Sequence, residues 1–333
     1  YAHVLRAFCL ALLVLAAAPA YAEEASRAEG DHFAVVVHFE APELAQEALT
    51  QVEQLWPIAA ALYGLPQGAR KDKLAVHLYR DTAGYEAAEQ KLTGGAFKRN
   101  LAFAHFGSKS AHVALQPYVG DEALARIGLP YLTRSMLLHE AAHLVRYEAM
   151  NNFRSHPGWF YDGAAMWLKH HVLAGERVDE VALSAKLAVR VQALLEKDEL
   201  PTVAQLLADD TGELAFYDRY AARCLFFRFL QETHGKRLVR ILKKTRGMGG
   251  GRDFTKRMSD VVRETLGKKR FAGLDDAFHA YVEKLKPAWD EPHRSLGPVE
   301  KDDGKADDDE TYFVQCAFPK TNAVAWRLSL IHI

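Results

Sequence analysis

The stretch that most constrains this chain runs from Leu138 to Val145 and has the sequence LHEAAHLV. It contains the pattern H-E-x-x-H, in which His139 and His143 lie about one helical turn apart on the same face. The flanking residues are apolar, as a buried helix requires if its only polar groups serve a metal ion. Two imidazoles at this spacing can bind one ion, and Glu140 can take a proton from a water on that ion. The sequence therefore predicts a metal-binding helix here.

A second apolar helix is predicted from the sequence PGWFYDGAAMWL, which covers residues 157–168. Its Pro-Gly start favours a turn that leads into a helix with one carboxylate near its beginning, that of Asp162. Eighteen residues separate His143 from Asp162. Carboxylate oxygen is an accepted zinc ligand, so we predict Asp162 as the third ligand and one Zn²⁺ per chain.

The two segments together resemble the gluzincins of the peptidase MA type, the relatives of thermolysin. In that family H-E-x-x-H is followed at this interval by P-x-W-[FL]-x-E-G-x-A-x-[YW] on a second helix. The family's zinc-binding glutamate is an aspartate here, which is shorter by one C–C bond, about 1.5 Å of reach. The second helix must then approach the first more closely, or the carboxylate must bind in another mode. The small residues Gly163, Ala164 and Ala165 would permit such a close approach. The residues that match the family pattern or come close to it are Pro157, Trp159, Phe160, Gly163, Ala165 and Trp167.

The resemblance implies a zinc metallopeptidase in which His139, His143 and Asp162 hold the ion and Glu140 is the general base. It also implies a tyrosine that donates a hydrogen bond to the oxyanion, which we assign to Tyr220 before Tyr217. The substrate would be a peptide or protein. Two alternatives stay open: hydrolysis of an amide outside protein, and a gluzincin fold without hydrolysis that binds a peptide or a cell-wall component.

Several other histidines lie in positions from which they could serve the site. On the strands, we expect His105 and His112 to face solvent. His156 is either a solvated loop residue or a substitute ligand, and His234 is either a residue at a helix end or an oxyanion donor. Eight and nine residues past Asp162, the pair His170 and His171 misses the metzincin spacing and is expected to end the second helix.

The predicted fold class is α+β, with a small N-terminal α/β sheet lobe over residues 31–118. The resembling family has such a sheet before its zinc helix, and its last strand lines the cleft. Here that edge is predicted at Ser110–Leu115, where an extended peptide can add by backbone hydrogen bonds. Periodicity predicts strands at Phe33–Phe39 and Lys73–Tyr79, a strand pair within Leu101–Leu115, and helices at Pro42–Tyr63 and Thr82–Leu92.

Residues 119–290 are predicted as a mainly helical zinc-binding lobe, so the fold is expected to be zincin-like with the H-E-x-x-H helix between the two lobes. Apolar residues at three- and four-residue spacing predict further helices, separated by proline or glycine. These helices are expected at Val178–Lys197, Tyr220–Glu232, Lys236–Lys244, Asp253–Leu266 and Leu274–Leu285.

The two ends of the chain have distinct compositions. Residues 1–22 combine a charged start, a short apolar run and an A-x-A site, which predicts a signal peptide cleaved near Ala22 and export to the periplasm or medium. The apolar run is too short for stable membrane insertion. Residues 291–333 are predicted to be an acidic, disordered tail.

The overall composition gives no sign of a nucleic-acid partner. A net charge of −1 leaves no global basic character, and the basic stretch Lys236–Arg257 contains a single aromatic residue, Phe254, rather than the interleaved series that nucleic-acid platforms need. Of the three cysteines, Cys9 leaves with the signal peptide. Cys224 can pair with Cys316 after export, but its apolar helix favours a small core residue.

Overall fold

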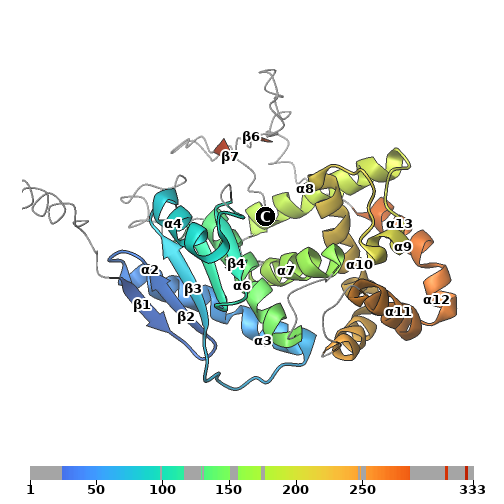
Figure 1. Ribbon diagram of the computed structural model, residues 1–333. Helices are drawn as coiled ribbons and strands as arrows, with labels where there is room; N and C mark the ends of the chain where they lie inside the picture. Colours follow the sequence, from blue (N-terminus) through green and yellow to red (C-terminus); the bar gives the residue numbers. More distant parts are fainter. Residues whose placement is uncertain are drawn as a thin grey trace, which may run out of the picture.

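The computed structural model describes residues 25–97, 100–115, 129, 131–150, 157–173, 177–246, 248, 253–285, 312–313 and 327–328, with the side chains of 131–132, 177–186 and the last two pairs left aside. The predicted signal peptide, His156, Cys316 and nearly all of the predicted tail lie outside these residues. The described part is mixed α+β, with the sheet on one side and most helices on the other (Figure 1). None of its helices is both long and apolar enough to cross a membrane.

Five strands form one mixed sheet in the order β1-β2-β3-β5-β4. The central strands β2 (Phe33–Val37), β3 (Leu74–Tyr79) and β5 (Ser110–Ala114) run parallel. The outer strands β1 (Ser26–Glu29) and β4 (Ala102–His105) are antiparallel to their neighbours. β1 was not predicted, because SRAE has no apolar alternation and is recruited by pairing with β2.

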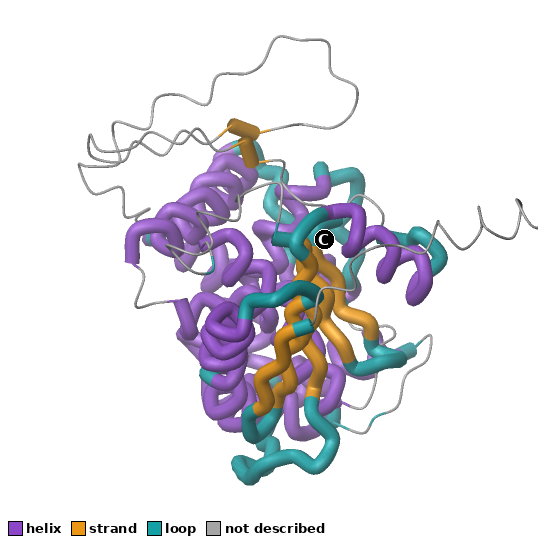
Figure 2. The backbone as a smooth tube through the Cα atoms, turned by 90° about the vertical axis from the view of Figure 1, so that its left-hand side faces the viewer, coloured by secondary structure: helices purple, strands orange, loops and turns teal. Residues whose placement is uncertain are grey.

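The two faces of the sheet carry different layers. Alternate residues of β2, β3 and β5, such as Val35, Val76 and Val113, enter the main core with helices α2 (Pro42–Glu53) and α3 (Leu55–Tyr63). The predicted helix at 42–63 is thus two helices that meet at Gln54. The opposite face packs against α4 (Thr82–Thr93) through a smaller cluster of Tyr79, Tyr85, Leu101, Phe103 and Ala114. Figure 2 shows the sheet beside the helices in a second view.

The helical part begins with α6 (Tyr131–Met150), which packs along β5 and β4 and against α7 (Gly158–Leu173). The longest helix, α10 (Phe216–Thr245), packs against α7 and α8 (Arg177–Glu196). Two predicted helices thus form the single helix α10, which bends at His234 (φ −133°, ψ 23°) rather than ending there. The remaining helices are α9 (Val203–Ala208), α11 (Phe254–Leu266), α12 (Lys268–Ala272) and α13 (Leu274–Lys284), and β6 (Tyr312–Phe313) pairs with β7 (Arg327–Leu328).

The prediction for the edge of the sheet was wrong. β5 lies between β3 and β4, so β4 is the edge strand at this end of the described sheet. The physical reason is the short hairpin between the two strands: β4 pairs back onto the free side of β5 and covers the backbone groups that β5 would otherwise expose.

Candidate metal centre

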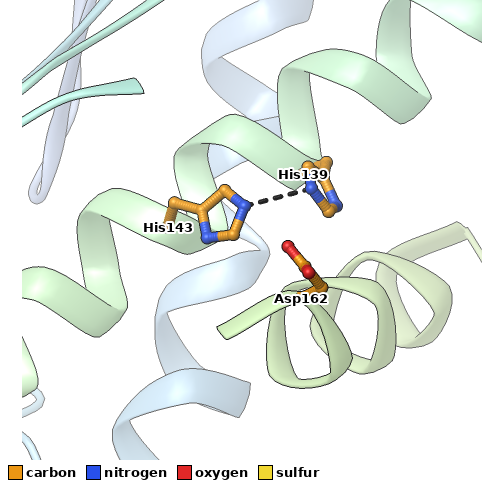
Figure 3. Close-up of side chains that lie close together, drawn as sticks. All are labelled: His139, His143 and Asp162. Carbon is orange, nitrogen blue, oxygen red and sulfur yellow. Dashed lines mark hydrogen bonds between the residues drawn. The ribbon is translucent and has the colours of Figure 1, made fainter. Parts of the chain in front are cut away.

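Helices α6 and α7 bring the three predicted ligands together. His139 and His143 project from consecutive turns of α6, and Asp162 faces them from the second turn of α7 (Figure 3). The Nε2 atoms of the two imidazoles are 3.0 Å apart. One nitrogen from each imidazole and one carboxylate oxygen of Asp162 lie within 4.8 Å of one another, so the group can hold a metal ion.

The orientation of the two rings favours shared coordination over a simple hydrogen bond. The His139 and His143 rings are nearly perpendicular, at 87°, with centroids 4.6 Å apart. Another histidine pair, His38 and His77, also has ring nitrogens 3.0 Å apart, but its rings are 5.2 Å apart at 25°. Those rings meet edge to edge, as in an N–H···N bond. Within the described part of the chain, the pair on α6 is the histidine pair that lies with a carboxylate oxygen in a group that could hold a metal ion.

Burial keeps the imidazoles in the form that binds a metal. Both rings are almost fully buried. Burial, aided by the charge of Lys169, lowers the pKa of His139 to about 3. Burial and the neighbouring His139 lower the pKa of His143 well below its usual value. Neutral imidazole offers a lone pair to a cation at neutral pH without first losing a proton.

The two carboxyl groups respond to burial in the opposite direction. Burial raises the pKa of Asp162 to about 7, with Asp209 adding to the shift and Arg223 opposing it. Burial and the nearby Asp162 raise the pKa of Glu140 to about 8, against a hydrogen bond from the backbone N–H of Ala104. A divalent cation between these groups would lower both pKa values by its own charge.

An aromatic ring stacks on His143, and a cation lies over that ring. The Tyr161 ring stacks on His143 with centroids 4.1 Å apart, and the Arg146 guanidinium lies 4.5 Å from the Tyr161 centroid. Neither residue was predicted. Arg146 lies one turn beyond His143 on α6, and Tyr161 is next to Asp162, so proximity to the motif was the only available signal. The Nδ1 atoms of His139 and His143 have no hydrogen-bond partner among the described residues.

A buried lysine is another residue that the sequence interpretation missed. Lys169 lies two turns after Asp162 on α7, and its Nζ donates to Ser135 Oγ at 3.0 Å, one turn before His139 on α6. Lysine is rarely buried without partners. Its spacing of seven residues from Asp162 puts it on the same helical face, which a pattern search for ligands does not test.

Of the two tyrosines proposed as oxyanion donors, one lies near the site and the other packs elsewhere. Tyr220 is half-buried on α10, and its hydroxyl donates to Cys224 one turn later; both Asp162 and Glu140 raise its pKa, after burial. It therefore lies near the site. Tyr217 instead packs under the guanidinium of Arg190, at 5.6 Å. Cys224 is a buried free thiol, which agrees with a core position.

Of the other histidines, His112 contradicts its prediction. It is buried, with Nδ1 2.9 Å from the Tyr79 hydroxyl and Nε2 2.7 Å from Ser110 Oγ. It is covered because the sheet continues on both sides of β5 and because α4 closes over this face. His105 is half-buried on β4. His170 and His171 lie in the last turn of α7, as predicted.

Gly163 allows α7 to pack closely against a neighbouring helix, but that helix is α10 and not, as we had expected, α6. An added Cβ on Gly163 would lie 2.5 Å from Phe227 Cβ and 3.1 Å from the Arg223 carbonyl oxygen, both on α10. Gly163 thus permits a close approach of α7 to α10 rather than to α6. At the start of α7, the N–H of Gly158 donates to Asp209 at 2.9 Å, and Arg223 binds the same carboxylate at 2.7 Å.

The chain was also compared with known proteins. No protein-family model matches it, and no curated protein matches it. The assignment of a reaction therefore depends on the chemistry of the site itself.

Proposed function

We propose that this chain is a zinc-dependent hydrolase of peptide bonds with a zincin-like fold. The observation that carries the proposal is the convergence of His139, His143 and Asp162, with two buried nitrogens 3.0 Å apart and the carboxylate within 4.8 Å. Two neutral imidazoles and one carboxylate are a donor set of catalytic zinc sites, in which a water takes the fourth position. Magnesium and calcium prefer oxygen ligands, so they fit this set less well.

When bound, zinc would supply a Lewis acid and an activated water near neutral pH. Glu140 would accept a proton at its carboxylate and then give it to the leaving amine. To do so it must be ionised, and a dication beside it would bring its pKa down from about 8. Tyr220 would stabilise the oxyanion after turning its hydroxyl away from Cys224.

The edge strand supports a peptide as substrate. The N–H of Ala114 bonds to the carbonyl of Leu101 at 2.8 Å, so Leu101 and Phe103 pair with β5. By the alternation of an antiparallel ladder, Ala102 and Ala104 direct their N–H and C=O groups to the free side of β4. Glu140 accepts from Ala104 there, so the free edge and the proposed base adjoin each other. An extended peptide could add to this edge by backbone hydrogen bonds.

The decisive experiment pairs metal analysis with the variant Glu140→Gln. The wild-type protein should carry about one zinc per chain and cleave a fluorogenic peptide library, with loss of activity on chelation and recovery with zinc. Glu140→Gln keeps the shape of the side chain but cannot accept the proton, so turnover should fall at least about a hundredfold. Its zinc content should be unchanged, because Glu140 is not a ligand. Retained turnover in this variant would refute the assignment of the base.

A second candidate is a binding module without hydrolysis, which two observations favour. The side chain of Asp162 is shorter than that of the glutamate in the resembling family. The Nδ1 atoms of His139 and His143 have no hydrogen-bond partner within the described structure. Loss of such supporting hydrogen bonds typically lowers metal affinity tenfold to a hundredfold. A chain that purifies without zinc and binds peptides without cleaving them would support this candidate.

A further inference from the structure

A buried hydroxyl on α4 is not accounted for by the contacts described above. Tyr85 on α4 is fully buried, and its hydroxyl has no hydrogen-bond partner in the described part of the chain. A buried polar group without a partner costs about 1–3 kcal/mol. Such a group requires a physical explanation.

The packing of Tyr85 brings its ring into the cluster that adjoins the proposed base. Its ring meets Phe103 edge-on at 5.6 Å, and Phe103 adjoins Ala104, whose N–H bonds to Glu140. Met136 of α6 packs against the same cluster, one helical turn before Glu140 and on the same helical face. Among nearby charges, Glu140 raises the pKa of Tyr85 more than Glu89 does, after burial itself.

We propose that Tyr85 is a positioning residue that holds the Glu140 carboxylate when a peptide occupies the β4 edge. In the free protein the Ala104 N–H serves Glu140. A peptide that adds to β4 takes up that N–H, and Glu140 loses its backbone donor. The Tyr85 hydroxyl is a buried donor nearby that has no competing partner in the described structure, so it replaces Ala104 and keeps the carboxylate oriented. This inference rests on the proposed function for the presence of a peptide, but not on its hydrolysis.

The variant Tyr85→Phe tests this role because it removes only the hydroxyl. In the metal-free protein we expect an unchanged or higher midpoint of urea unfolding, since the lost group had no partner. We expect affinity for an uncleavable peptide, with the scissile amide replaced by methyleneamine, to fall about tenfold to a hundredfold, as for a lost hydrogen bond to a charged group. In zinc-loaded protein kcat should fall as well, because the base loses its orientation.

A double-mutant cycle with Glu140→Ala isolates the coupling. If Tyr85 acts on Glu140, Tyr85→Phe should leave peptide affinity unchanged in the Glu140→Ala background. Equal losses in both backgrounds would overturn the proposal, and so would a wild-type protein that binds no peptide. Peptide binding with the expected coupling, but without hydrolysis, would reject the proposed reaction and leave the role of Tyr85 standing.

Two control variants separate this role from simpler explanations. Tyr63→Phe removes another buried hydroxyl that has no partner among the described residues, and it should leave peptide affinity unchanged. Glu89 has a buried Oε2 without a partner, one turn after Tyr85 on α4. If Glu89→Gln lowers peptide affinity as much as Tyr85→Phe, Tyr85 acts through Glu89, and the assignment to Glu140 is wrong.

Discussion

Whether the Asp162 side chain is long enough to serve as the third zinc ligand can be tested by lengthening it by one methylene. A tetrahedral zinc site with bonds of about 2.0–2.2 Å separates its ligand atoms by about 3.3 Å. The imidazole nitrogens are already 3.0 Å apart, so the longest separations in the set, up to 4.8 Å, belong to the oxygen of Asp162. The carboxylate therefore falls short by at most about 1.5 Å, which is the reach that one additional methylene gives.

Asp162→Glu should therefore bind zinc more tightly than the wild-type protein does. We expect the Kd from calorimetric titration at pH 7.5 to fall at least about tenfold, which corresponds to about 1.4 kcal/mol. Asp162→Asn keeps the size of the side chain without its charge and should bind zinc more weakly than wild type. An Asp162→Glu variant that folds normally but binds zinc no better than Asp162→Asn would show that this carboxylate is not a ligand.

Two further predictions concern stability. Gly163→Ala should lower the free energy of unfolding by about 1–3 kcal/mol through overpacking against Phe227; Gly68→Ala, where an added Cβ meets nothing within 4 Å, is the matched control in urea unfolding. Burial lowers the pKa of His112 to about 3, so between pH 6.5 and pH 3 the unfolded state binds more protons at this ring than the folded state does. The contribution of neutral His112 to folding stability is therefore complete above pH 6.5 and is lost as the pH falls toward 3. At pH 5 the loss is about 2 kcal/mol, and His112→Gln should reduce the difference in stability between pH 7.5 and pH 5 by that amount.

The site could be predicted from the sequence because its spacing is local. His139 and His143 are four residues apart, so helix formation alone sets their separation. The structure brings Asp162 to them through one further event, the packing of α7 on α6. The patterns of strands β2 and β3 and of helices α4, α7, α8, α11 and α13 were likewise strong enough to predict those elements to within a few residues, whereas α6 begins seven residues before the stretch Leu138–Val145 that predicted it.

The residues around the site could not be predicted because contacts between segments far apart in the sequence place them there. Tyr85 comes from α4, and Ala104 from an edge strand whose place in the sheet depends on a hairpin. The alternation of polar and apolar residues predicted that His112 faces solvent, but α4 covers that face of the sheet and His112 is buried. The role of Gly163 was assigned to the wrong neighbour, since small residues indicate a close approach without indicating the helix that approaches.

The packing of α7 links the stability of the helical part to the geometry of the site. Asp162 adjoins Gly163, so the helix surface that carries the ligand is next to the contact that sets the distance between α7 and α10. At the start of α7, Asp209 holds both the N–H of Gly158 and the side chain of Arg223 from α10. These contacts to α10 therefore fix the position of the helix that carries Asp162, so a change in them should move the carboxylate relative to the two imidazoles.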